Sequence, residues 1–147
     1  MSITGSGLYG LSLEKALIDT LGESWEAEDN RVLMVTDTYT PDFNAHDFYA
    51  DITNEVTGTG YTAGGELLTT TEITLSGGVL TFDAADVAWT TSTIANAMAG
   101  VLKTTVSGSA TDQLILLSDF VTPASSSGGT FTIQWSASGI ATVDYVP

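Results

Sequence analysis

Cysteine is absent from this chain of 147 residues, and basic residues are scarce. Without cysteine there are no disulfides, no thiol catalysis and no cysteine-ligated zinc. Three lysines and arginines stand against 18 aspartates and glutamates, giving a formal net charge of −15. Because nucleic acids and anionic lipid surfaces are bound through clustered cations, we expect neither as a partner. The acidity favours a neutral or basic protein surface, or a cation, although solubility alone also explains it.

Long apolar runs are missing as well. No run approaches the roughly 18 consecutive apolar residues of a transmembrane helix. Residues 1–8 (MSITGSGL) lack the basic start and the apolar stretch of a secretory signal, so we expect no N-terminal export signal. The chain nevertheless has 43% hydrophobic and only 14% charged residues, a balance typical of a folded protein. Its length predicts one domain with a sizeable core.

The N-terminal residues predict an arm that precedes the domain. Residues 1–10 are small, glycine-rich and nearly uncharged, which is typical of a flexible arm. Residues 11–147 then form a single β-rich domain. Such an arm can lie on a neighbouring subunit, and the side chains able to anchor it there are Ile3, Leu8 and Tyr9.

Two short helices are predicted. Residues 11–21 (LSLEKALIDTL) carry leucines along one helical face, with Ser12 as a possible cap and Gly22 as the stop. A strand followed by a turn remains the alternative there, because the segment is short. A second helical piece of one or two turns is predicted within residues 45–52.

The remaining chain predicts β structure. Apolar β-branched runs indicate buried strands, alternation indicates half-buried ones, and Gly77-Gly78 predicts a hairpin turn. For residues 93–105 we favour a long strand with a bulge at Gly100 over a helix. Residues 122–129 (TPASSSGG) predict a surface loop. The predicted strands are residues 31–36, 55–61, 67–75, 79–82, 113–120, 130–135 and 139–143, with another that begins at residue 87.

Short strands at this spacing predict a mainly β fold. We expect a single-domain antiparallel β-sandwich or open barrel of six to eight short strands, with one or two short helices. No internal repeat or linker divides the chain.

The segment 37–65 gathers the features that could hold chemistry, including the only histidine. Gly58-Thr-Gly60 fits the letters of a dinucleotide-binding loop, but a strand–helix context is not predicted around it. His46 has neither a nucleophile motif nor further nitrogen ligands in the sequence. We therefore expect a structural histidine, bonded to a nearby backbone group or to Asp47.

Acidic residues in the same segment leave one metal alternative open. Asp42 and Asn44 begin like an EF-hand loop, but Asp47 stands at its glycine position and Thr53 at its glutamate position. Turn-forming side chains are the favoured interpretation, and an irregular calcium site near Asp42 is the alternative. The sequence thus predicts no catalytic residues and no cofactor, and we expect a protein that is not an enzyme.

Three blocks of the sequence carry a family resemblance: residues 39–65 (YTPDFNAHDFYADITNEVTGTGYTAGG), 82–94 (FDAADVAWTTSTI) and 120–140 (FVTPASSSGGTFTIQWSASGI). Over residues 31–140 the chain resembles small β-rich virion proteins of tailed bacteriophages. The resemblance implies a structural virion protein, most like the capsid decoration or cement proteins, which bind the major capsid protein on the capsid exterior. It brings no catalytic residues. By analogy it favours trimers over dimers.

Contact residues follow from this hypothesis. Tyr39, Phe43 and Tyr61, together with the three arm residues named above, are the candidates for capsid or subunit contacts. One alternative function is a head-fibre or adsorption module that binds host-surface glycans, which predicts an exposed aromatic cluster around Tyr39, Tyr49 and Tyr61. A tail or head-completion structural protein is a further alternative.

Overall fold

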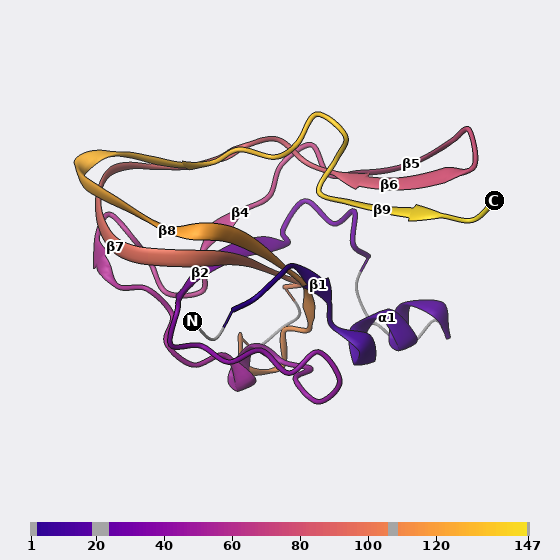
Figure 1. Cartoon of the computed structure of the whole chain (residues 1–147), viewed down its shortest axis with the longest axis horizontal. Coiled ribbons are helices and arrows are strands. Elements are labelled where there is room, and N and C mark those ends of the chain that lie inside the picture. Colours follow the sequence, from indigo (N-terminus) through magenta and orange to yellow (C-terminus); the bar gives the residue numbers. More distant parts are fainter. Residues whose placement is uncertain (1–2, 19–23, 106–108, 147) are drawn as a thin grey trace.

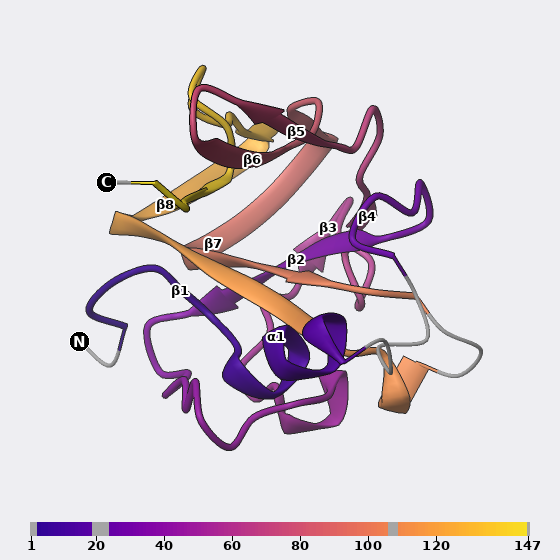
Figure 2. The same cartoon turned by 90° about the vertical axis from the view of Figure 1, so that its right-hand side faces the viewer.

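The computed structural model describes residues 3–18, 24–105 and 109–146, and these form a mainly β, sandwich-like fold with nine strands in two antiparallel sheets (Figures 1 and 2). In the six-stranded sheet the order is β1-β8-β7-β2-β4, and β3 also pairs with β7; the smaller sheet has the order β5-β6-β9. The elements are β1 Gly7–Leu8, α1 Gly10–Leu17, β2 Arg31–Thr36, η1 Tyr49–Asp51, β3 Gly58–Thr59, β4 Glu66–Leu67, β5 Glu72–Ser76, β6 Val79–Asp83, β7 Val87–Lys103, η2 Ser109–Thr111, β8 Leu114–Ile133 and β9 Ala141–Asp144.

Two long strands dominate the fold, whereas the sequence predicted mostly short strands and a long one only over residues 93–105. β7 and β8 have 17 and 20 residues and pair along their length, and Figure 1 shows the pair curling back on itself at the left. The predicted loop at residues 122–129 is wrong, because Ala124, Ser126 and Gly129 of this stretch pair with β7. The side chains of this stretch are polar because they are largely exposed, and the strand forms all the same because backbone hydrogen bonds pair it with its neighbour.

Irregularities in the β7–β8 pair lie at other positions than the sequence suggested. Residues 93–103 are strand, as favoured, but Gly100 pairs in regular register with both neighbouring strands. Most of the register shifts occur instead around residues 89–99, where Thr91 and Asn96 have positive φ, and one more lies between Leu102 and Lys103. Such bulges bend a strand and increase its twist, in keeping with the curl of the pair.

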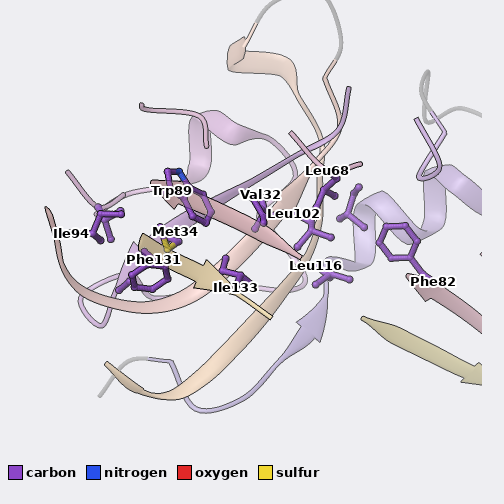
Figure 3. Packing of buried hydrophobic residues seen from close by; sticks show 14 residues of the cluster. Val32, Met34, Leu68, Phe82, Trp89, Ile94, Leu102, Leu116, Phe131 and Ile133 are labelled. Atoms are coloured by element: carbon purple, nitrogen blue, oxygen red, sulfur yellow. The ribbon is translucent and has the colours of Figure 1, made fainter. Parts of the chain in front are cut away.

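Around β2 both faces of the six-stranded sheet are buried, which explains the unbroken apolar run of this strand. Val32 and Met34 belong to one core cluster, and Leu33 and Val35 to the other. The first cluster packs against β7 and β8 and reaches as far as the small sheet (Figure 3). The second cluster is completed by N-terminal residues and by residues of the segment 37–52. That segment therefore serves as a cover for one face of the sheet.

The N-terminal residues pack on their own domain, which corrects the prediction of a flexible arm for residues 1–10. Ile3 and Tyr9 are fully buried, and β1 adds to the edge of β8. The backbone N–H of Tyr9 donates to the carbonyl of Ile115 at 3.0 Å. Residues 1 and 2 lie outside the described residues.

The predicted first helix is confirmed in its N-terminal half. α1 begins one residue earlier than expected, with Tyr9 as the N-cap, so Ser12 lies buried inside the first turns and does not cap. The predicted continuation beyond residue 18 and the stop at Gly22 fall outside the described residues. The second helical piece is the single turn η1. Among the described residues, no helix has the length and apolar character that crossing a membrane requires.

The small sheet projects from the body, with the C-terminal end beside it (Figure 1). The predicted hairpin and edge strand are confirmed as β5-β6 and β9, but the first hairpin strand, predicted over residues 67–75, begins only at Glu72, and Leu67 belongs to β4 of the large sheet. Gly77 and Gly78 both have positive φ in the hairpin turn, which glycine adopts without strain. Phe82 of β6 ties the sheet to the first core cluster, where its ring lies 6.1 Å from that of Trp25.

Candidate contact surface

One face of the small sheet is apolar from the core outward. Residues paired across neighbouring antiparallel strands point to the same face, and residues two apart share a face. The register therefore places two apolar rows side by side. The inner row is Ile73, Phe82 and Ala141, and the outer row is Leu75, Leu80 and Val143.

The two rows differ in what covers them. The inner row packs against the first core cluster, whereas in the outer row Leu75 is 67% exposed and Val143 48%. Tyr145, two residues beyond Val143, is 54% exposed and bonds through its backbone N–H to the carbonyl of Gly78 at 3.0 Å. The outer row and Tyr145 thus extend an apolar face past the body that covers its inner half.

The opposite face of the small sheet is mostly polar and anionic, with Val79 as its apolar residue. Threonines Thr74, Thr81 and Thr142 form its central row, and the same face carries Glu72, Asp83 and Asp144. The three strands contain no lysine or arginine. The projecting sheet is therefore amphipathic, with apolar side chains on one face and uncompensated carboxylates on the other.

All three basic side chains of the chain are engaged within the fold. Lys15 pairs with Asp47, and Lys103 pairs with Asp112 in a buried ion pair. The Arg31 guanidinium donates to the carbonyl oxygen of Gly65 at 2.8 Å. Each cation is held by its own chain, and the projecting sheet has none beside its acids.

A carboxylate fastens the segment 37–65 to the sheet. Glu55 accepts hydrogen bonds from the hydroxyls of Tyr49 and Tyr61, both at 2.6 Å, and from the backbone N–H of Gly64 at 2.7 Å. The Tyr61 hydroxyl in turn accepts the N–H of Met34 in β2 at 3.0 Å. We call this group the Glu55 clamp. Burial, and then the hydrogen bond to Glu55, raises the pKa of both tyrosines.

His46 belongs to a second, mostly buried chain of hydrogen bonds. Its Nδ1 lies 2.8 Å from the hydroxyl of Tyr39, which lies 2.9 Å from the hydroxyl of Tyr9. Burial raises the pKa of Tyr39 to about 12 and raises that of Tyr9 further. The predicted backbone partner is present, since the N–H of Asp42 donates to Nδ1 at 3.4 Å, but the shorter contact is to the tyrosine hydroxyl, which the sequence did not predict. The chain joins the N-terminal residues to the segment 37–52.

The predicted contact residues do not form one surface. Ile3, Tyr9 and Tyr39 are fully buried inside the chain, so their side chains cannot reach a partner in this conformation. Phe43 is half-buried, with its ring 5.2 Å from that of Tyr9. Leu8 and Tyr61 are half-buried against the first core cluster.

The exposed apolar residues of the small sheet were missed, although a signal for them was present. The hairpin sequence alternates on both sides of Gly77-Gly78, and the last strand alternates as well. Pairing these three segments would have placed Leu75, Leu80 and Val143 in one row. What the sequence alone did not show is that the row extends beyond the core.

Other motifs have structural explanations. A Cβ added at Gly58 would lie 1.9 Å from the carbonyl oxygen of Thr93, so this glycine permits the close approach of β3 to β7. The next element after Gly58-Thr-Gly60 is the short strand β4, where a dinucleotide-binding loop would be followed by a helix. The Asp42 carboxylate accepts the N–H groups of Asn44 and Ala45 at 3.0 and 3.1 Å, which is the geometry of a turn. Within residues 3–18, 24–105 and 109–146, no three acids or histidines gather as a metal site.

Comparison of the chain with protein-family models, with curated proteins and with solved structures finds no match.

Proposed function

We propose that the chain is a structural protein of a tailed-bacteriophage virion that binds the outside of the capsid and stabilises it, as a decoration or cement protein does. The sequence resemblance supports the virion origin. The observation that carries the binding role is the outer row with Tyr145, a projecting apolar face that its own chain leaves uncovered. Exposed apolar side chains on neighbouring strands offer surface that a protein partner can bury.

The described geometry supports binding more than catalysis. The four tyrosines whose pKa is raised are hydrogen-bonded to Glu55 or to each other inside the fold, where they join segments distant in sequence. A capsid offers many equivalent sites, so a modest contact by each copy adds up to substantial stabilisation of the particle. The trimer, or the dimer, that the resemblance suggests would increase this effect.

Charge supports the capsid exterior as the location. The net charge of −15 is repelled by packaged nucleic acid, whose phosphates are bound through cations. Three cations that are all engaged within the fold do not provide such a surface. An anionic domain is instead compatible with the outside of a particle.

The geometry does not favour the glycan-binding alternative. That function predicted an exposed aromatic cluster of Tyr39, Tyr49 and Tyr61. Tyr39 is fully buried, and the hydroxyls of the other two are occupied by Glu55. A sugar would need their ring faces or hydroxyls free.

The experiment compares particles with and without the protein. We expect copies in the hundreds per particle, on the order of the number of capsid subunits. Particles without it should release their DNA at a lower temperature and under milder osmotic shock, and adding the purified protein should restore resistance. A dozen copies or fewer, or unchanged resistance, would refute the decoration role. Loss of host attachment with intact capsid stability would favour the adsorption module.

A further inference from the structure

We propose that Lys103 and Asp112 condense to an amide, which cross-links the last residue of β7 to the residues that lead into β8. The folded chain forms this bond on its own, without an enzyme or a cofactor. The cross-link is independent of the proposed capsid binding.

The two reacting groups meet in the interior of the fold. The Nζ of Lys103 contacts Oδ2 of Asp112, and the two side chains are only 3% and 2% exposed. The neighbouring Leu102 and Leu114 are fully buried, and the ring centre of Tyr49 lies 5.1 Å from Nζ. An amine and a carboxyl group are therefore held against each other where bulk water is excluded.

Hydrogen bonds fix the backbone on both sides of the pair. Directly after Lys103, the N–H of Thr104 donates to the carbonyl of Gln113 at 2.9 Å, and the N–H of Gln113 donates to the Thr104 hydroxyl at 3.0 Å. The carbonyl of Asp112 accepts the N–H of Tyr49 at 2.8 Å. Groups held in a reactive geometry behave as if their concentration were about 10⁵–10⁸ M. Such fixation supplies the rate that free amines and carboxylates lack.

The buried charges supply the driving force. Taking two charges out of water is costly even when they attract each other, and burial favours the neutral amine and the neutral acid. The nitrogen of Lys103 bonds to the carboxyl carbon of Asp112, and one carboxyl oxygen leaves with two of the three ammonium protons as water. The step replaces two buried charges with a neutral amide and consumes no other reactant.

The other lysine of the chain provides a natural control. Lys15 contacts the carboxylate of Asp47, but these two side chains are 25% and 13% exposed. Water hydrates both charges there and keeps the amine protonated, so we expect this pair to remain ionic. The two pairs have the same chemical groups and differ in their burial.

Mass spectrometry of the purified, folded full chain tests the cross-link. The wild type should weigh about 18 Da less than its sequence, which is the loss of one water per molecule. Lys103→Arg should have its full sequence mass, because a guanidinium keeps the positive charge beside Asp112 but is never neutral and cannot attack. Lys15→Arg is the matched control and should keep the deficit.

Trypsin digestion locates the bond. Trypsin has three cleavage sites in the chain, which are Lys15, Arg31 and Lys103. An unmodified chain gives separate peptides of residues 32–103 and 104–147. An amide on Nζ removes the charge that trypsin recognises, so the cross-linked chain should give one peptide of residues 32–147 that is about 18 Da lighter than its sequence.

Two results would overturn the inference. One is a wild type with its full sequence mass, which would leave Lys103 and Asp112 as an ion pair. The other is a deficit that persists in Lys103→Arg, or that is lost in Lys15→Arg, since either would place the lost water elsewhere. None of these measurements involves a capsid, so the cross-link and the proposed function can fail separately.

Discussion

Replacing Glu55 with glutamine tests whether the Glu55 clamp stabilises the fold. The carboxylate accepts three short hydrogen bonds, whereas the amide has one oxygen and presents an N–H₂ group to at least one of the three donors. Hydrogen bonds to charged groups contribute about 1.5–3 kcal/mol each, against about 0.5–1.5 for neutral ones. Losing one bond and weakening two predicts a loss of about 2–4 kcal/mol in the free energy of unfolding.

Urea and thermal unfolding monitored by circular dichroism measure this loss. For a chain of this length each kcal/mol lowers the Tm by about 2–4 °C, so the Tm should fall by roughly 5–15 °C. Glu72→Gln is the control, since Glu72 is exposed on the small sheet. A loss in Glu55→Gln no larger than that of the control would refute the clamp.

A double-mutant cycle with Tyr61→Phe isolates one arm of the clamp. The phenylalanine keeps the ring packed and removes only the hydroxyl, which both donates to Glu55 and accepts from Met34. The two substitutions share a hydrogen bond, so their effects should fall short of additivity by about 1–2 kcal/mol. Strict additivity would mean that the bond contributes no coupling.

Three further predictions concern the same fold. Gly64 and Gly65 both have positive φ, but only at Gly65 would an added Cβ meet backbone, 2.0 Å from a carbonyl oxygen of β2. Gly65→Ala should therefore lower the free energy of unfolding by more than about 3 kcal/mol, and Gly64→Ala, which has open space, by about 1 kcal/mol. Equal losses in urea unfolding would contradict this. Lys103→Met removes the cation that pairs with the buried Asp112 and should lower the free energy of unfolding by about 3–5 kcal/mol. The double variant Lys103→Met/Asp112→Leu should recover most of this loss. A mild loss in the single variant would contradict a buried ion pair. The third prediction concerns alkaline pH. Above about pH 10 the unfolded state releases tyrosine protons that the folded state still holds, because folding raises the pKa of these tyrosines. Stability should therefore be fully present below pH 10 and fall as pH rises through the pKa values of the folded state, about 12 for Tyr39. Unfolding free energies that stay constant from about pH 9 to 11.5 would contradict it. The four tyrosines concerned are Tyr9, Tyr39, Tyr49 and Tyr61.

Elements with local signals could be predicted from the sequence. β2 is an unbroken apolar run because both of its faces are buried, and the β5-β6 hairpin is marked by two glycines that its turn requires. The lengths of β7 and β8 could not be predicted, because the middle of β8 is largely exposed and rich in serine, threonine and glycine. Backbone hydrogen bonds between the two strands hold that stretch, and composition carries little trace of them.

The burial of two candidate contact residues could not be predicted for a related reason. Ile3 and Tyr9 lie in a small, glycine-rich stretch that is typical of an arm, yet both are buried. The partner of the Tyr9 hydroxyl is Tyr39, 30 residues away, and the partner of its backbone N–H is Ile115. Local composition cannot show such contacts, because they exist only once distant segments have folded together.

The small sheet shows how one strand can serve both the fold and a contact. In β6, Phe82 is buried in the first core cluster, while Leu80, two residues away on the same face, lies in the outer row. Side-chain alternation makes both residues apolar and does not distinguish them. Only the point at which the body ends under the sheet divides the inner row, which stabilises the fold, from the outer row, which extends beyond the body. Substitutions in the outer row can therefore test binding without removing the core.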